Sequence, residues 1–168
     1  QDAVVVDLGA NNATVSDTEI TLTGGAKGSS DYIDLPDGIV SGLGDAVTFE
    51  AWATQISVQN WSRIFDFGTS TAENVFMSWT SGTTLDADRV EWLGPNDSDT
   101  LDNTNAPYTL GVEFHIVCVF DNGLVTWYTG PADSEDLGES KGSFQSNNQL
   151  SELNDTNCWL GRSQWEDS

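Results

Sequence analysis

Residues 31–68 read DYIDLPDGIVSGLGDAVTFEAWATQISVQNWSRIFDFG, and this stretch decides the fold. It predicts three successive β-strands, over residues 31–35, 47–54 and 61–67, because runs rich in apolar and aromatic residues are separated by turn residues. The first break, Pro36-Asp37-Gly38, combines a fixed φ, a side chain that can bond its own backbone, and a residue free to adopt positive φ. The chain is therefore expected to reverse direction there.

The middle strand of this stretch alternates apolar and polar residues with a period of two, which is typical of a half-buried strand. One face carries Phe49, Ala51 and Ala53, and the other carries Thr48, Glu50, Trp52 and Thr54. One face of this strand is therefore expected to contact the core.

The rest of the chain continues in the same manner, with short β-rich runs bounded by Gly, Asn, Asp or Ser. Asn122-Gly123 between two such runs is a strong hairpin signal, because both residues tolerate positive φ. No segment keeps a helical period, so the sequence predicts an all-β fold, a sandwich of two antiparallel sheets. Further strands are predicted over residues 3–8, 19–23, 74–80, 88–93, 100–102, 112–120 and 124–130, around Phe144, and over 158–160, with 130–142 as a loop.

Five blocks of the sequence, in the same order, resemble laminin-G-like domains of the concanavalin A-like lectin/glucanase superfamily, of the type found in secreted bacterial proteins. The resemblance extends over residues 24–165 and implies a jelly-roll β-sandwich that occupies residues 1–168 as a single domain. This superfamily includes lectins, adhesion domains and hydrolases, so the resemblance indicates the fold more strongly than the function. The blocks are YIDLPDGIVSGL, TFEAWAT, NWSRIFDFG, HIVCVFDNGLVTWY and NDTNCWLGRSQW.

One feature departs from the family pattern. After a block like LGRSQWEDS, relatives continue into a further strand beside the N-terminal strand, whereas this sequence ends at Ser168. Three interpretations stay open: the sequence is truncated, the N-terminal segment fills the position, or another chain donates the strand by edge pairing.

Net charge limits the partners and the environment. The chain has 27 acidic residues against 5 Lys plus Arg, a formal charge of −22, and the acids are spread along its length. Nucleic acid and anionic membranes are therefore poor partners, and no apolar run is long enough for membrane insertion. The composition favours a marine or high-salt environment. The resemblance implies an extracellular protein, secreted or on a cell surface.

The two cysteines, Cys118 and Cys158, lie in apolar β-rich segments. Two buried free thiols are one interpretation, because an isolated Cys in a core strand behaves as a small hydrophobe. An extracellular location favours a disulfide between them instead.

Catalysis is not expected of this sequence. The resemblance implies that hydrolases of the superfamily carry a Glu-x-Asp-x-Glu pattern on one strand, and the nearest approach here, Asp86 to Glu91, places its two ends on opposite faces of a strand. The single histidine, His115, falls in a core-like strand, and we expect it to be structural.

Carbohydrate binding is the favoured function, because sugars stack on aromatic rings and bond to acidic, amide and guanidinium groups. Most tryptophans are expected in the core, Trp127 and Trp159 among them, and Trp52 and Trp61 in a covered layer with Glu50 and Arg63. Tryptophans at strand ends, with their polar neighbours, are the candidates for an exposed ligand surface. These candidate ligand-binding residues are Trp79, Arg89, Glu91, Trp92, Arg162 and Trp165.

A calcium ion is a further candidate, since the resemblance implies a Ca²⁺ site at a loop edge. Asp97, Asp99 and Asp102, near Asn96 and Asn103, offer oxygen ligands, although a solvated acidic loop explains the same residues. The sequence as a whole predicts a non-catalytic, extracellular carbohydrate-binding module. The alternative is a structural or adhesion domain that binds protein, or another copy of itself, through an open sheet edge.

Overall fold

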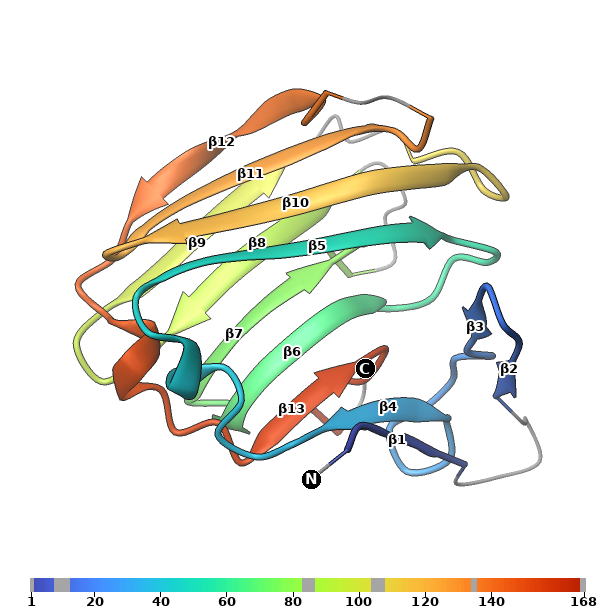
Figure 1. Cartoon of the computed structure of the whole chain (residues 1–168), viewed down its shortest axis with the longest axis horizontal. Coiled ribbons are helices and arrows are strands. Elements are labelled where there is room, and N and C mark those ends of the chain that lie inside the picture. The colour runs from blue at the N-terminus through green and yellow to red at the C-terminus, as the bar shows by residue number, and fades with distance from the viewer. Residues whose placement is uncertain (1, 8–12, 83–86, 104–107, 134–135, 167–168) are drawn as a thin grey trace.

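The computed structural model describes residues 2–7, 13–82, 87–103, 108–133 and 136–166, and it shows two antiparallel sheets packed face to face (Figure 1). The larger sheet has seven strands in the order β1-β4-β13-β6-β7-β8-β9. The smaller has four, in the order β12-β11-β10-β5, and β2 pairs with β3 in a separate hairpin. The fold is therefore the two-sheet β-sandwich expected from the sequence.

The strands follow the predicted pattern closely, and β8 has the predicted bounds. Two differences are informative: β12 occupies part of the expected 130–142 loop, and β2 lies outside all predicted strands. Neither segment has a continuous apolar run, and both pair at the margins of the structure, where few side chains need to be buried. The strands are β1 Val4–Val6, β2 Thr14–Val15, β3 Ile20–Thr21, β4 Tyr32–Leu35, β5 Ala46–Thr54, β6 Arg63–Ser70, β7 Glu73–Ser78, β8 Asp88–Leu93, β9 Ser98–Asn103, β10 Glu113–Asp121, β11 Leu124–Pro131, β12 Glu139–Gln145 and β13 Asn157–Leu160.

The predicted hairpin joins β10 to β11 and keeps the two strands in register from Asp121 opposite Leu124. Asn122 and Gly123 have φ of 49° and 85°, the double positive φ of a type I′ turn. A Cβ atom at Gly123 would lie 2.3 Å from the carbonyl oxygen of Ser146, so glycine is required there for two independent reasons.

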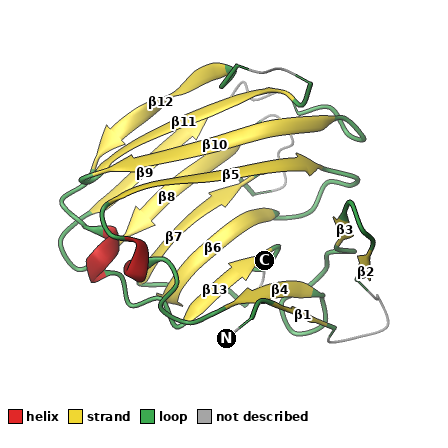
Figure 2. Ribbon diagram, viewed as in Figure 1, coloured by secondary structure: helices red, strands yellow, loops and turns green. Residues whose placement is uncertain are grey.

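Two short 3₁₀ helices, η1 Ser41–Leu43 and η2 Leu150–Glu152, lie together at one end of the sandwich (Figure 2). The buried carboxylate of Asp155 fastens η1, because its Oδ2 accepts hydrogen bonds from the backbone N–H groups of Val40 and Ser41 at 2.8 and 3.1 Å. The side chain thereby satisfies donors that the short helix leaves unpaired.

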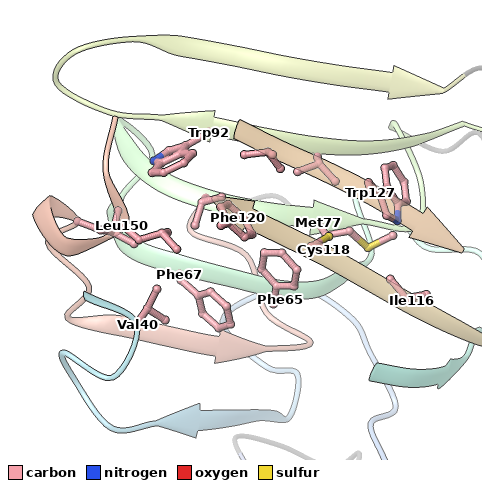
Figure 3. Close-up of a cluster of buried hydrophobic side chains, with 14 of the residues drawn as sticks. Val40, Phe65, Phe67, Met77, Trp92, Ile116, Cys118, Phe120, Trp127 and Leu150 are labelled. Atoms are coloured by element: carbon pink, nitrogen blue, oxygen red, sulfur yellow. The ribbon is translucent and has the colours of Figure 1, made fainter. Parts of the chain in front are cut away.

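The core lies between the two sheets and consists of the inward-facing residues of both (Figure 3). Alternation along β5 confirms the predicted half-buried strand, with Phe49 packed against Phe65, Phe67 and Phe120. Trp127 is fully buried in this core, as the sequence predicts.

Cys118 and Cys158 are both buried in the core and both free, so the expected disulfide is wrong and the alternative of two free thiols holds. Burial raises the pKa of both thiols, that of Cys158 to about 12. Each side chain acts here as a small apolar residue on the inner face of its sheet.

No helix in the described part of the chain is long and apolar enough to cross a membrane.

Candidate functional site

The outer face of the seven-stranded sheet carries an unusual group of charged and aromatic side chains. Strand pairing places Phe76 between Asp66 on β6 and Glu91 on β8, and places Arg89 opposite Asp102 on β9. Because paired residues of an antiparallel sheet share a face, all five project away from the core. Neighbouring residues in each strand, such as Val75 and Val90, project inward and are fully buried.

A pocket of about 250 Å³ opens on this outer face. Its walls combine two indole rings with two guanidinium groups, a carboxylate and an amide. The lining residues are Asn60, Trp61, Arg63, Phe76, Arg89, Glu91 and Trp165.

Trp61 is held in an uncommon backbone conformation, with φ of 52°. A positive φ is costly for a bulky residue and persists only where surrounding contacts enforce it. Its N–H donates to the carbonyl oxygen of Gly82 at 2.9 Å, and its own carbonyl accepts a hydrogen bond from Arg63 Nη1 at 2.9 Å. The backbone of the neighbouring Ser62 is bonded to Thr80. Trp61 is therefore presented at the pocket by a fixed loop.

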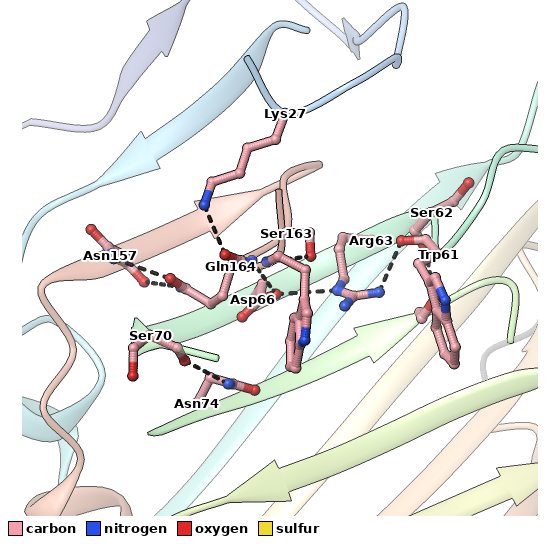
Figure 4. Close-up of polar contacts among 12 residues, drawn as sticks. Lys27, Trp61, Ser62, Arg63, Asp66, Ser70, Asn74, Asn157, Ser163 and Gln164 are labelled. Carbon is pink, nitrogen blue, oxygen red and sulfur yellow. Dashed lines mark hydrogen bonds and ion pairs between the residues drawn. The ribbon is translucent and has the colours of Figure 1, made fainter. Parts of the chain in front are cut away.

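Trp165 reaches the pocket from the segment that follows β13. Its ring packs edge-on against Phe76, with centroids 5.6 Å apart. The preceding residue, Gln164, anchors this segment: its N–H donates to Asp66 Oδ2 at 3.0 Å, and its carbonyl accepts a hydrogen bond from Lys27 Nζ at 2.7 Å (Figure 4). The pocket thus combines elements that are about a hundred residues apart in sequence.

Asp66 connects Arg63 on β6 to the segment that carries Trp165. Its carboxylate is fully buried, and its Oδ2 also accepts a hydrogen bond from Arg63 Nε at 3.1 Å. Burial raises the pKa of Asp66 to about 6, although Arg63 and Gln164 oppose that shift. Burial likewise lowers the pKa of Arg63. The pair is buried, so removal of either charge would leave the other uncompensated.

Arg63 lies between the two indoles. Its guanidinium carbon is 3.9 Å from the ring centroid of Phe76, 5.4 Å from that of Trp165 and 5.8 Å from that of Trp61. Such contacts with aromatic faces are favourable for a cation. Both indoles therefore lie around the same guanidinium group.

Arg89 and Glu91 form the other side of the pocket. Arg89 donates to both carboxylate oxygens of Asp102, at 2.6 and 2.9 Å, and to Glu91 Oε2 at 2.8 Å, and it lies over the ring of Trp61. Burial acts to lower the pKa of Arg89, but these carboxylates outweigh it and the pKa is raised. Glu91 Oε1 accepts no hydrogen bond from the described residues, so it is available to a ligand hydroxyl.

The expectation that Trp79 and Trp92 are exposed is wrong. Only 6% and 1% of their surfaces are accessible, and both rings belong to the core, where Trp79 packs on Tyr108 and Trp92 on Phe120. The period of two explains both errors. Arg89 and Glu91 on β8 face outward, so Trp92 must face inward; Ser78 at the end of β7 pairs with Arg89 and shares its face, so the next residue, Trp79, faces inward as well.

Arg162, the other residue expected near Trp165, stacks on Tyr32 and Trp159 at 4.1 and 4.6 Å rather than lining the pocket. Trp159 is buried as predicted, but on the outer side of the sheet and beneath two cations, Arg162 and Lys27.

The predicted covered layer of Trp52, Trp61, Glu50 and Arg63 does not exist. Trp52 and Glu50 lie on the outer face of the other sheet, where Trp52 is 54% exposed and Glu50 pairs with His115. Arg63 pairs with Asp66 instead of Glu50.

The three expected calcium ligands are placed apart. Asp97 accepts hydrogen bonds from Ser98 and Asn147, Asp102 is held by Arg89, and Asp99 pairs with the inward-facing Trp92. Among the described residues, no three acidic, His or Cys side chains form a metal-binding group. Asp86 lies outside the described residues.

Sequence reasoning did not assign Asn60, Trp61, Arg63 and Phe76 to a ligand surface. The exposure of Trp61 could have been predicted, because it stands in a polar turn two residues before the first residue of β6. The outward position of Phe76 could not, since a phenylalanine in a strand between Val75 and Met77 is typical of a core residue.

Comparison with known proteins agrees with this architecture. The sequence model of one protein family, described as the concanavalin A-like lectin/glucanases superfamily, matches residues 27–168 of this chain. One similar solved structure is domain 4 of AbnA, a GH43 extracellular arabinanase from Geobacillus stearothermophilus, in complex with arabinotriose. The TM-score is 0.70 at 15% sequence identity, over 98% of this chain and 75% of that one. No curated protein matches the sequence significantly.

Proposed function

The chain belongs to the concanavalin A-like lectin/glucanases superfamily, and from that premise we propose that it is a carbohydrate-binding module whose ligand occupies the Trp61–Trp165 pocket. The observation that carries the proposal is the pair of indoles, on fixed backbone segments, at the two sides of a pocket lined with polar groups. Sugar rings stack their C–H faces on such rings, and a preorganised site loses little conformational entropy on binding.

The ligand class follows from the charges of the pocket. Both guanidinium groups are already paired, Arg63 with Asp66 and Arg89 with Glu91 and Asp102. The pocket therefore offers no unpaired positive charge to a uronate or sulfated sugar, and the chain has a net charge of −22. We infer a neutral oligosaccharide, held by stacking and by hydroxyl contacts with Glu91 and Asn60. The arabinotriose complex of the similar domain supports this class.

A binding role without catalysis is part of the proposal. Asp66 is fully buried and bonded to Arg63, and Glu91 is bonded to Arg89. Carboxylates held in this way are poorly suited to approach a glycosidic bond as the acid and base of a hydrolase. We place the module outside the cell, as part of a larger secreted or surface protein, because an acidic surface of this kind suits salty water.

The test is titration of the purified chain with neutral oligosaccharides, arabinan fragments among them, followed by tryptophan fluorescence and calorimetry with and without Ca²⁺. We expect saturable binding that weakens at least tenfold in Trp61→Ala and in Trp165→Ala. Trp92→Phe is the matched control, since it changes a core tryptophan and should keep the affinity. Full affinity in both pocket variants would refute this site.

A second candidate function rests on β5, which is the edge of the four-stranded sheet and pairs only with β10 among the described strands. Nine residues long, with Glu50 as its one charged residue, β5 lacks the lysines and prolines that usually protect an edge. An adhesion domain that accepts a strand from a protein partner would use this edge. Concentration-dependent oligomers that are abolished by Thr48→Pro would favour that function, and a monomer at millimolar concentration would exclude self-pairing.

A further inference from the structure

Trp52 stands on the sheet that the pocket does not use. It is 54% exposed, and one face of its indole stacks on the imidazole of His115, with centroids 4.5 Å apart and planes inclined by 8°. His115 is only 5% exposed, and its Nε2 lies 2.7 Å from Glu50 Oε1. The buried imidazole therefore fixes the orientation of an exposed aromatic ring, which leaves the other indole face accessible.

The neighbours of Trp52 on this face carry hydrogen-bonding groups. Register places His115 opposite Trp52, and Val117 opposite both Glu50 and Tyr128. Glu50 stands two residues from Trp52, about 7 Å along the strand, and Tyr128 stands two strands away from Glu50, about 10 Å across the sheet. The same outer face also presents Thr48, Thr126, Ser140 and Ser143.

We propose that this outer face of the four-stranded sheet, centred on Trp52, Glu50 and Tyr128, is a second glycan-binding surface. Its ligand is a neutral polysaccharide chain that stacks on Trp52 and accepts and donates hydrogen bonds along the row toward Tyr128. The surface does not depend on the Trp61–Trp165 pocket, because the two lie on opposite outer faces of the sandwich.

The composition of the face favours a sugar over a protein. Strands β5, β10, β11 and β12, whose residues are all described, expose two large hydrophobic side chains, Trp52 and Leu124, and these lie at opposite ends of the sheet. Protein interfaces centre on a contiguous apolar core, which this face does not provide. Self-association and anionic ligands are also opposed by the net charge of −22.

Two surfaces on opposite faces make the module bivalent. A bivalent binder bridges two polymer chains, or two parts of one chain, and gains avidity without new contacts. The wild-type protein is therefore expected to cross-link a soluble polysaccharide, whereas a protein with one surface removed binds without cross-linking.

The experiment uses the double variant Trp61→Ala/Trp165→Ala, which removes the pocket. Affinity electrophoresis in gels that contain neutral arabinan, xylan or β-glucan measures what remains. We expect residual retardation, lost when Trp52→Ala is added and largely kept with Trp52→Phe, and turbidity with polysaccharide in the wild type alone. Urea unfolding of each variant confirms that it is folded.

The outcomes separate the two proposals. Loss of all binding in the pocket double variant, with full binding and turbidity in Trp52→Ala, would overturn the second surface and leave the pocket intact. Binding that depends on Trp52 alone would support the second surface and refute the pocket. Failure of every protein to bind, or self-association abolished by Trp52→Ala, would also overturn the second surface.

Discussion

The backbone N–H of Gln164 donates to the buried carboxylate of Asp66 at 3.0 Å, and this hydrogen bond joins the end of the described chain to the middle strands of the large sheet. The same Asp66 oxygen holds Arg63, while its other oxygen has no hydrogen-bond partner in the described part of the chain. One carboxylate thus positions both Arg63 and the segment that carries Trp165. The pocket depends on a residue that does not line it.

Asp66→Asn should weaken ligand binding more than it destabilises the fold. The substitution keeps the shape and removes the counter-charge of the buried Arg63, but it also removes a carboxylate whose burial is unfavourable, as its raised pKa shows, so the two effects on stability oppose each other. It also weakens the bond to Gln164, so Trp165 should lose its fixed position. Urea unfolding gives the stability change, and fluorescence titration gives the affinity.

Asp102→Asn is the matched control for that variant, because its pair with Arg89 is partly exposed and Arg89 keeps Glu91. Its cost should stay below about 1 kcal/mol. Equal losses of ligand affinity in the two variants would show that Asp66 does not position the pocket.

Stability should fall as pH rises from about 4 to about 6. Burial raises the pKa of Asp66 and of Asp88 to about 6, from an ordinary value of 3.8. The folded state therefore binds a proton more tightly than the unfolded state. Each group contributes stability that is complete below pH 4 and lost as pH passes 6, about 3 kcal/mol by linkage.

Urea unfolding between pH 4 and 8 measures this dependence. Asp88→Asn should remove the contribution of Asp88, so that the free energy of unfolding varies less with pH than in the wild type. Asp88 suits this purpose, since it is buried and has no ion pair with a described residue. A stability that increases from pH 4 to pH 7 would show that the buried carboxylates do not govern it.

Trp92→Ala should be far more damaging than Trp52→Ala. Trp92 is 1% exposed in the core, so its truncation leaves a large cavity and should cost about 3–5 kcal/mol. Trp52 is half exposed, and its loss removes the contact with His115, worth about 1 kcal/mol. Thermal and urea unfolding of the two variants should differ clearly. Similar midpoints would place Trp92 outside the core.

Both cysteines should be unreactive until the protein unfolds. They are free and buried, and the raised pKa values keep them protonated at neutral pH. A thiol reagent should modify neither residue in the native protein and both in guanidinium chloride, and a reducing agent should not change the free energy of unfolding. If the unfolded protein contained no reactive thiol and its mass were that of the oxidised chain, a disulfide between the two cysteines would be shown instead.

The fold was predictable from sequence because its signals are local. The alternation in residues 47–54, the Asn122-Gly123 turn and the apolar run of β10 each depend on neighbours within a few residues. The sequence predicted β12 only around Phe144 and assigned its start to a loop, because residues 139–143, ESKGS, have neither alternation nor bulk; this part is a strand through its pairing with β11.

The candidate site was predicted only in part. Arg89, Glu91 and Trp165 do reach the pocket, since polar residues beside a tryptophan are visible in sequence. Trp79 and Trp92 were assigned to the wrong side because both stand at strand ends near polar loops, whereas the alternation along the strands turns them inward.

The sequence by itself determined the class of the fold, the position of most strands and the acidic surface, because backbone propensity, turn chemistry and charge act locally. Only the tertiary structure decided which aromatic rings meet a ligand. Trp61, Phe76 and Trp165 come together through strand register and through the bond between Asp66 and Gln164, residues 98 positions apart. Such a long-range pairing depends on how the two ends of the chain pack, and no local pattern specifies it.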